Sequence, residues 1–252
     1  SEIKKKLAGS DMVFITCGLG GGTGTGAAPE IAKVAKKEGA LTIAVVTLPF
    51  TIEGQKRIEN AIIGLEKLES FVDTLIIIPN DKLLELAPKL PLQTAFKIAD
   101  EILTNAVKGI TELITTNGIV NLDFADIKAV MTNGGVSLIG MGESDTDQRA
   151  IEAVEKAIDN PLLDVDISNA TGALVNVFGG PNMSLDEYKL IIETVGNKLN
   201  PEAKLIGGAQ ISEDLDKSIR VLLIVTGVKS AQITGGSNST ESLKHKEIEE
   251  EL

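Results

Sequence analysis

Cysteine, histidine and aromatic residues are scarce in this sequence of 252 residues, and their scarcity excludes several kinds of protein. One cysteine excludes an internal disulfide, and one histidine excludes a histidine-based catalytic centre or a zinc site. No tryptophan, one tyrosine and six phenylalanines leave few platforms on which bases could stack. The net charge of −12 comes without a basic cluster, so we expect no binding to nucleic acid.

Long apolar runs are missing as well. No run approaches the length of a membrane helix and no signal peptide is visible, so we expect a cytoplasmic protein without direct membrane insertion. Apolar residues make up 43% and charged residues 24%, the balance of a globular protein with a substantial core. Cys17 lies in an apolar run, which predicts a small core residue rather than a functional thiol.

Glycine, by contrast, is concentrated in one short stretch. Residues 20–26 read Gly-Gly-Gly-Thr-Gly-Thr-Gly, between an apolar run at 12–17 and a helical pattern at 27–38. Glycines let the backbone approach a phosphate closely, and the following helix N-terminus offers free N–H groups. Thr23 and Thr25 add hydroxyls suited to phosphate oxygens or a bound magnesium ion. The stretch therefore predicts phosphate binding, since an ordinary tight turn needs only one or two glycines.

Two familiar phosphate loops fit this stretch poorly. The P-loop requires a lysine, and residues 20–26 contain none. Gly22, Gly24 and Ala27 match the looser dinucleotide pattern G-x-G-x-x-A. That pattern also needs a ribose-binding carboxylate at the end of the next strand, which instead ends in Leu48-Pro49. A nicotinamide or flavin dehydrogenase is therefore the weakest interpretation.

The first part of the chain alternates strands and helices. Predicted strands at 12–17, 41–47 and 73–78 are separated by helices near 27–38 and 53–70, the pattern of a parallel α/β sheet. A strand as apolar as 12–17 belongs in the middle of a sheet with neighbours on both sides. We therefore expect an upstream part of this domain that the chain does not contain.

A long helix is predicted from about 92 to 116, spanning roughly 37 Å. Its wide apolar stripe predicts burial between layers. The strands and helices beyond it predict a second α+β domain with a four-stranded sheet. The strands are expected near 134–142, 172–178, 204–210 and 219–226, and the helices near 124–132, 146–159 and 184–197. The predicted division is 1–91, a partial Rossmann-like domain; 92–122, the central helix and following loop; 123–228, the second domain; and 229–252, a disordered tail.

At this point the residues resemble a known family. Gly20 to Gly26, followed by Ala-Ala-Pro, resembles the signature loop of tubulins and their prokaryotic homologue FtsZ, with Thr25 as in FtsZ. Asn121-Leu-Asp-Phe-Ala-Asp126 is similar to the family's second hallmark, the loop that completes the GTPase site of a neighbouring subunit. The resemblance covers about 1–228, and further matches are Glu53-Gly-Gln-Lys-Arg57, Ile78-Pro-Asn-Asp-Lys-Leu83 and Pro161-Leu-Leu-Asp164.

The resemblance implies a site for GTP or GDP, with magnesium expected from phosphoryl-transfer chemistry. It places the phosphates at Gly20, Gly21, Gly22, Thr23, Gly24, Thr25 and Gly26, the ribose and a phosphate near Glu53 and Arg57, and the guanine near Asn80, Phe96 and Asp100. Each of the last five residues also has a structural interpretation. Glu53 and Arg57 could form a surface ion pair and Asn80 could cap the turn 81–87, while Phe96 could belong to the core and Asp100 could be a solvated helix position.

Asn121, Asp123 and Asp126 carry the implied catalytic role. By themselves, Asp123 and Asp126 are explained as a helix cap with a second carboxylate three residues on. The functional interpretation is that both carboxylates orient a water that attacks the γ-phosphate. The long helix separates them from the phosphate loop by about 30–40 Å, so the acids must act on the next subunit's nucleotide. Such a head-to-tail contact generates open filaments.

The resemblance thus implies a cell-division GTPase that polymerises with itself at the mid-cell division site. Division-site tethering proteins could bind its C-terminal tail. Because family members carry an upstream phosphate segment, we expect this chain alone to be inactive. The alternative is a non-hydrolysing structural or regulatory relative that binds filament ends, although Asp123 and Asp126 argue against it.

Overall fold

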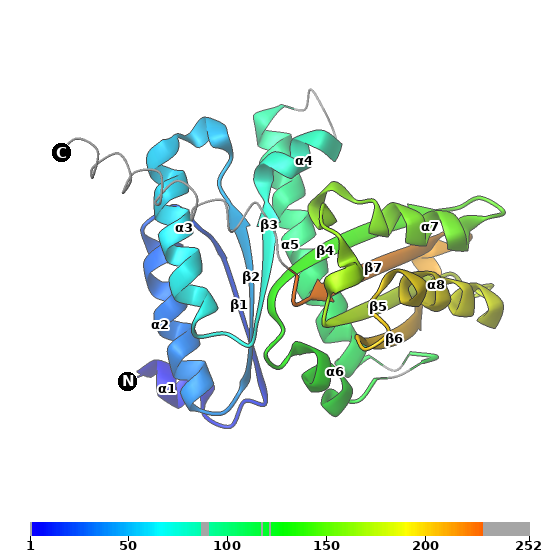
Figure 1. Ribbon diagram of the computed structural model, residues 1–252, viewed down its shortest axis with the longest axis horizontal. Coiled ribbons are helices and arrows are strands. Elements are labelled where there is room, and N and C mark those ends of the chain that lie inside the picture. The colour runs from blue at the N-terminus through cyan, green and yellow to red at the C-terminus, as the bar shows by residue number, and fades with distance from the viewer. Residues whose placement is uncertain (1, 87–90, 117, 121, 229–252) are drawn as a thin grey trace, which may run out of the picture.

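Seven strands form one mixed sheet in the order β1-β2-β3-β4-β7-β5-β6. The computed structural model describes residues 2–86, 91–116, 118–120 and 122–228, and the predicted tail at 229–252 lies outside them (Figure 1). The strands are β1 (Met12–Gly18), β2 (Leu41–Leu48), β3 (Thr74–Pro79), β4 (Gly135–Ser144), β5 (Gly172–Gly179), β6 (Lys204–Ile211) and β7 (Ile219–Thr226). The helices are α1 (Glu2–Leu7), α2 (Thr23–Lys37), α3 (Gln55–Glu69), α4 (Asn80–Leu86), α5 (Leu92–Thr115), α6 (Phe124–Met131), α7 (Arg149–Ile158) and α8 (Leu185–Lys198).

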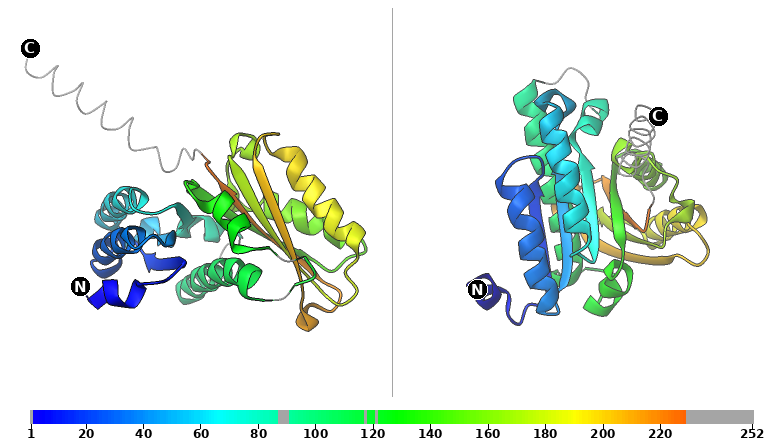
Figure 2. Two further views of the ribbon diagram at one scale, coloured as in Figure 1. Left: turned by 90° about the horizontal axis from the view of Figure 1, so that it is seen from below. Right: turned by 60° about the vertical axis from the view of Figure 1, so that its left-hand side comes forward.

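Strands β1, β2 and β3 are parallel, as the sequence predicted. Their side chains alternate between two apolar clusters, because successive residues of a strand point to opposite faces. Ala44 and Val46 pack with residues of α2 and α3, whereas Ile43 and Val45 pack with residues of α5. Figure 2 shows these helices on the two sides of the strands. Coverage of both faces explains why the strands read as continuous apolar runs.

Strand β1 lies at the edge of the sheet, although its apolar sequence predicted neighbours on both sides. Among the described strands it pairs only with β2, in register from Met12 with Leu41 onward. Most of its residues are only half-buried and Thr16 is exposed, whereas the first five residues of β3 are all buried. The second neighbour was expected in an upstream part that the chain does not contain, so the edge position of β1 among the described strands agrees with that expectation, and the upstream part itself stays a prediction.

The second half contains the predicted four-stranded sheet. Strand β7 pairs antiparallel with β4 and β5, and β6 pairs parallel with β5. One feature was not predicted: the first residues of β4 also pair with β3, from Thr74 opposite Gly135 to Ile76 opposite Ser137. These three residue pairs join the two halves into one sheet. The mixed α/β architecture with a long helix and a four-stranded second part confirms the predicted fold class.

Helix α5 connects the halves by contacting both β2 and β5. Its buried side includes Ala106 and Ile110, but Thr104, Asn105 and Lys108 are exposed, so the helix is not buried all round as predicted. At Gly109 a Cβ atom would lie 2.1 Å from Leu222 Cδ2, and Asn176 Nδ2 donates to the Gly109 carbonyl at 2.9 Å. Within the described ranges, no helix combines the length and apolarity that a membrane crossing needs.

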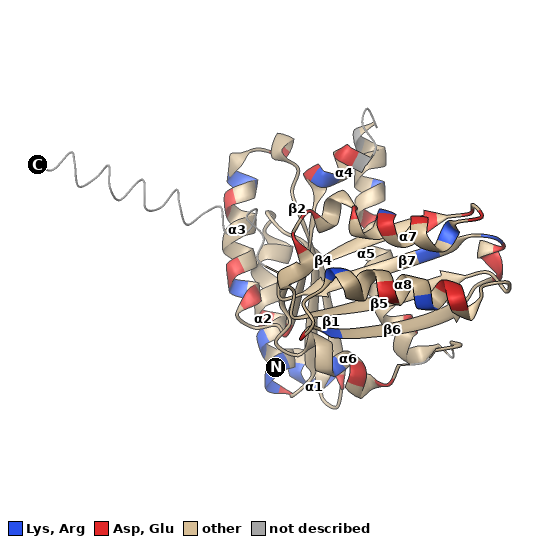
Figure 3. Ribbon diagram, turned by 45° about the vertical axis from the view of Figure 1, so that its right-hand side comes forward, with Lys and Arg blue, Asp and Glu red and all other residues tan. Residues whose placement is uncertain are grey.

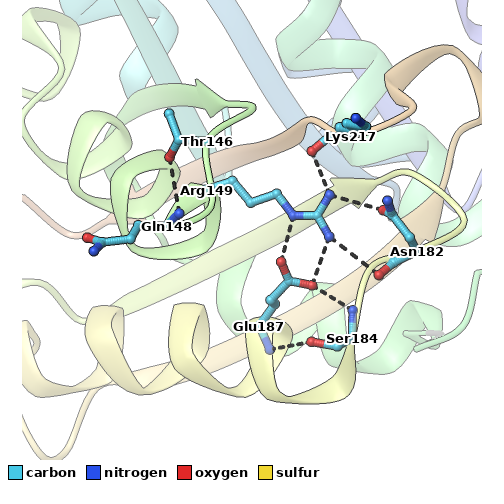
Figure 4. A network of polar contacts seen from close by, with 7 residues as sticks. All are labelled: Thr146, Gln148, Arg149, Asn182, Ser184, Glu187 and Lys217. Atoms are coloured by element: carbon cyan, nitrogen blue, oxygen red, sulfur yellow. Dashed lines mark hydrogen bonds and ion pairs between the residues drawn. The ribbon is translucent and has the colours of Figure 1, made fainter.

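A polar cluster lies at the starts of α7 and α8 in the second half of the chain (Figure 4). Arg149, the first residue of α7, donates from Nε to Glu187 Oε1 at 2.6 Å and from Nη2 to Glu187 Oε2 at 3.1 Å. Its Nη1 donates to Asn182 Oδ1 at 3.0 Å and to the carbonyl of Lys217. We call Arg149, Asn182, Glu187 and Lys217 the Arg149 cluster. It joins α7 and α8 to the loops before α8 and β7.

Candidate functional site

The glycine-rich stretch forms the turn between β1 and α2, as predicted from the sequence. Leu19 is 5% exposed and donates its N–H to the Thr47 carbonyl at 2.9 Å, which anchors the turn to β2. Gly20 has φ +99°, a conformation that favours glycine, and its N–H donates to Thr25 Oγ1 at 2.9 Å. Helix α2 begins at Thr23, four residues earlier than predicted, so the last glycines of the stretch are helical.

Two kinds of glycine can be distinguished in this turn. A Cβ on Gly24 would lie 2.5 Å from the Gly18 carbonyl oxygen, and one on Gly20 would lie 2.8 Å from the Arg57 carbonyl oxygen. These two positions exclude side chains because other backbone comes close. Around Gly21 and Gly22 there is nothing within 4 Å of the position of a Cβ. The fold has room for a side chain at Gly21 and Gly22, so glycine is not required by packing at these positions. Because glycine has no side chain, the outer surface of the turn stays open.

The N-terminus of α2 is suited to an anion. Its N-cap residue, Gly22, offers no side chain to the helix, and the first turn contains no acidic residue. The first N–H groups of a helix carry the positive end of the helix dipole, and phosphates bind there in many proteins. Thr23 is exposed beside these groups. The residues therefore fit a phosphate group.

Glu53 and Arg57 lie next to this turn, and they do form the ion pair of the structural interpretation. Glu53 Oε1 also accepts from the Phe50 N–H at 3.0 Å. The Arg57 side chain is 56% exposed, so such a pair contributes little to stability. Its backbone carbonyl borders Gly20, so the start of α3 and the phosphate turn are neighbours.

Asn80 stands at the carboxyl end of β3, as the first residue of α4. It is 5% exposed, and its Oδ1 has no hydrogen-bond partner within the described part of the chain. A helix cap would use that oxygen, so the capping interpretation is not what the structure shows. A buried acceptor without a donor costs roughly 1–3 kcal/mol. Such an atom indicates a missing donor, which a purine base could supply.

Phe96 and Asp100 occupy the first half of α5, one helical turn apart. Phe96 is 39% exposed and meets the fully buried Phe50 edge to face, with 5.1 Å between ring centroids. It is therefore not a core residue, and its exposed area is available to a ligand. Asp100 is exposed, as the solvated interpretation predicted. Pro49 and Phe50 connect Phe96 to Gly20, so the phosphate turn, Arg57 and Phe96 lie together near the carboxyl ends of β1 and β2. Asn80 lies at the carboxyl end of β3.

Asp123 and Asp126 lie at the start of α6, and both are exposed. Figure 3 shows where acidic positions, in red, occur along the ribbon, including near α6. They form a reciprocal cap, in which the Asp126 N–H donates to Asp123 Oδ1 at 2.8 Å and the Asp123 N–H donates to Asp126 Oδ2 at 3.3 Å. The predicted capping arrangement is therefore present. Each carboxylate still has a second oxygen free of that exchange. Asn121, the third predicted catalytic residue, lies outside the described residues.

The acid pair and the phosphate turn lie at opposite poles of the molecule. The Met131 carbonyl at the end of α6 accepts from Thr74 Oγ1, at the amino end of β3, whereas the phosphate turn follows the carboxyl end of β1. Figure 1 shows α6 at one end of α5 and α4 at the other. The 24 residues of α5 make it about 36 Å long. One chain therefore does not bring the two groups together.

Sequence reasoning missed several contacts around the phosphate turn. The Thr25 hydroxyl is used inside the protein by Gly20, and Asp81 binds the Thr51 N–H at 3.0 Å. Burial raises the pKa of the Cys17 thiol to about 11, which keeps it protonated. Across the described ranges no group of three acidic, histidine or cysteine side chains converges on a metal position.

Comparison with known proteins covers most of the chain. Residues 1–88 match the Tubulin/FtsZ family, GTPase domain, and residues 135–229 match the FtsZ family, C-terminal domain. Cell division protein FtsZ 1 of Thermococcus kodakarensis is 63% identical over 91% of the chain, and cell division protein FtsZ of Methanothermobacter thermautotrophicus is 56% identical over 99%. The chain spans 61% and 66% of these relatives' lengths.

Solved structures match the fold closely. A structure described as an empty FtsZ dimer from M. jannaschii superposes with a TM-score of 0.88 at 58% identity. The match covers 90% of this chain and 66% of that one.

Proposed function

This chain belongs to the FtsZ family, and from that premise we propose that it is part of a cell-division GTPase that assembles head to tail and hydrolyses GTP between subunits. One observation carries the proposal: the phosphate turn and the acid pair occupy opposite ends of α5. A nucleotide held at one pole can meet such acids only on a second molecule. The charged pair at the far pole then has a functional as well as a structural role.

At the nucleotide pole, the N-terminus of α2 and the open turn at Gly21 and Gly22 bind the phosphates. Arg57 and Glu53 lie beside the turn, where they contact ribose and phosphate oxygens. The orphaned Oδ1 of Asn80 accepts from the base. Phe96 and Asp100 complete the guanine end of the site. Magnesium bound to the phosphates supplies positive charge against the charge that develops in the transition state.

At the acid pole, the carboxylates of Asp123 and Asp126, with Asn121, orient a water toward the γ-phosphorus of the adjoining subunit. The water oxygen bonds to phosphorus while the bond from phosphorus to the β–γ bridging oxygen breaks, and the water's proton passes to a carboxylate or to bulk water. The products are GDP and inorganic phosphate. The acids are thus half of a site that only assembly completes.

The assembly that follows is an open filament, because a contact between two different poles does not close on itself. A relative at 58% identity has been solved as a dimer, which is in line with self-association. Because these relatives are named cell division proteins, we propose that the protein acts in the cytoplasm at the mid-cell division ring. Tethering proteins at that site are the proposed partners of the tail at 229–252.

Replacing Gly22 with aspartate is expected to weaken nucleotide binding by about 100-fold. Space around this position is open and its φ is −78°, so the side chain fits, but a carboxylate would stand where the phosphates bind. The measurement is the Kd for GTP and GDP in the complete gene product that carries this chain, with circular dichroism to confirm folding.

Gly22→Asn is the matched control, since it adds the same bulk without the charge. Its loss of affinity is expected to be smaller, and the gap between the two variants is expected to narrow at high salt. Equal GTP affinity in the wild type and the aspartate variant would contradict phosphate binding at this turn.

A further inference from the structure

Thr25 has both functional groups of its side chain engaged within the protein. Its Oγ1 accepts from the Gly20 N–H at 2.9 Å, across the phosphate turn. Gly20 has φ +99°, so this bond holds the one residue of the turn with a left-handed backbone. Without the hydroxyl, the Gly20 N–H would lose the partner that keeps the turn in this shape.

The methyl group of Thr25 has its own partner on α3. Gly64 is buried, and a Cβ atom there would lie 2.5 Å from Thr25 Cγ2. The missing side chain at Gly64 thus forms a notch that receives the methyl. Because side chains in a core are packed without spare volume, this contact sets how closely α3 approaches α2.

The start of α3 returns to the same turn. A Cβ on Gly20 would meet the Arg57 carbonyl oxygen at 2.8 Å, so the backbones of Gly20 and Arg57 are also in close contact. Gly20 therefore contacts Thr25, Thr25 contacts Gly64 of α3, and Arg57 of α3 contacts Gly20. Movement of Thr25 would shift the turn and the Glu53–Arg57 pair relative to each other.

Thr23 differs from Thr25 in its surroundings. The two are two residues apart on a helix, about 200° around its axis, so their side chains point in nearly opposite directions. Thr23 is exposed at the helix start, whereas Thr25 is partly buried against α3. Of the two residues, Thr23 is the exposed one, and its hydroxyl accepts no bond from the phosphate turn in the contacts described.

We propose that Thr25 is a positioning residue of the nucleotide site rather than a nucleotide contact. Its hydroxyl maintains the phosphate turn, and its methyl seats α3 so that Arg57 and Glu53 keep their distance from the turn. This inference rests on the proposed GTP binding. It also explains why threonine, with both a hydroxyl and a methyl, occupies the position.

Two nearly isosteric substitutions separate the two groups. Thr25→Val keeps the shape and removes the acceptor, and it is expected to weaken GTP binding about tenfold because the turn loses its internal bond. Thr25→Ser keeps the acceptor and removes the methyl, and a change in affinity of about threefold or less is expected. Both variants are expected to lower the unfolding temperature of the nucleotide-free protein. A direct ligand contact would leave that temperature unchanged.

The notch at Gly64 provides a test that needs no nucleotide. Gly64→Ala alone is expected to lower the unfolding temperature, because its methyl collides with that of Thr25. In Thr25→Ser combined with Gly64→Ala the methyl moves from one helix to the other. The pair is expected to be more stable than the sum of the single changes, and thermal unfolding of all four proteins gives the coupling. Additive effects would show that the two side chains do not contact each other.

Val195→Ala, in the buried part of α8, controls for loss of stability alone. It is expected to lower the unfolding temperature while leaving GTP affinity unchanged. If Thr25→Val binds GTP as tightly as the wild type does, the positioning role is refuted. If the complete wild-type gene product that carries this chain binds no GTP, the proposed function fails, while the Thr25–Gly64 coupling still decides whether the packing is as described.

Discussion

Replacing Asp123 with asparagine is expected to lower GTP turnover by about 100-fold or more while leaving GTP affinity within about twofold of the wild type. The nucleotide pole is at the other end of α5, so binding does not depend on this residue. Turnover depends on it because an amide cannot accept the proton of the attacking water. The measurement, in the complete gene product that carries this chain, is phosphate release at saturating GTP, beside the Kd for GTP.

Asparagine is chosen because Asp123 has two tasks. It caps α6 by accepting from the Asp126 N–H, and asparagine caps a helix about as well as aspartate does. A loss of turnover in this variant therefore reports the carboxylate and not the cap. Ser184→Ala is the converse control, since Ser184 and Glu187 form the same kind of cap on α8. It removes a cap far from the acid pair and is expected to leave turnover unchanged.

Wild-type turnover by the asparagine variant would reduce Asp123 to a helix cap and favour a relative that binds filaments without hydrolysing GTP. An intermediate loss would be resolved by Asp126→Asn, which tests the second carboxylate. If both single variants retain full activity, the acid pole is not the catalytic half of the site.

Mixing two inactive variants tests whether the site is shared. A Gly22→Asp subunit has an intact acid pair, and an Asp123→Asn subunit has an intact nucleotide pole. In an equal mixture about a quarter of random head-to-tail contacts join the two intact halves, so the mixture is expected to recover up to about a quarter of wild-type turnover. No recovery, in a mixture shown by sedimentation to co-assemble, would place both halves within one subunit.

The order of strands and helices was predictable because the pattern of each segment is strong. The runs at β1 to β3 are apolar on both faces, and the stripe of α5 keeps helical spacing over more than twenty residues. The predicted limits of β5, β6 and β7 differ from the observed ones by at most one residue. Such patterns reflect the repeat of a helix or a strand, and in this protein the tertiary contacts preserve the elements that the patterns predict.

Two features depend on contacts between distant residues, and the sequence did not indicate them. The pairing of Gly135 with Thr74 joins the two halves of the sheet, yet nothing in either segment specifies its partner. Helix α2 also begins earlier, at Thr23, than helix propensities predict, because glycine disfavours helices and Gly24 and Gly26 lie in its first turn. Close approach of Gly24 to the Gly18 carbonyl explains that glycine, and only coordinates show it.

For the candidate site, the motifs gave the residues but not their surroundings. Asn80 was as well explained by a cap as by a ligand; its orphaned oxygen argues against the cap, and the ligand role stays a prediction. Thr25 was predicted to contact phosphate because it belongs to a phosphate-binding motif. Its hydrogen bond with Gly20 could be found only from the three-dimensional structure. The roles of Asp123 and Asp126 remain predictions, since the cap that they form is compatible with both interpretations.

Replacing Arg149 with methionine is expected to lower the free energy of unfolding by about 2–4 kcal/mol. Methionine keeps much of the length of the side chain but leaves Glu187 without its ion-pair partner. The carbonyl oxygen of Lys217 and Oδ1 of Asn182 lose donors as well. Because the side chains of Arg149 and Glu187 are only 12% and 23% exposed, water replaces these bonds incompletely. Urea unfolding at pH 7 gives the difference.

Arg220→Met is the matched control, because Arg220 Nε binds Glu143 Oε2 at 2.7 Å in a pair that is nearly half exposed on both sides. That exposed pair is expected to contribute about 1 kcal/mol or less. Equal losses in the two variants would show that burial adds nothing to the Arg149 cluster.

Acid provides a second test of the Arg149 cluster. The hydrogen bonds from Arg149 hold the pKa of Glu187 below its ordinary value. The folded protein thus binds that proton less readily than the unfolded chain does, so the contribution is complete above the unfolded pKa, roughly 4.3, and disappears as pH falls through the folded value. The stability gap between wild type and Arg149→Met is therefore expected to be constant from pH 7 to about 5.5 and to narrow below about pH 4. A gap that persists undiminished in acid would assign the stabilisation to the bonds with Asn182 and Lys217, which do not titrate.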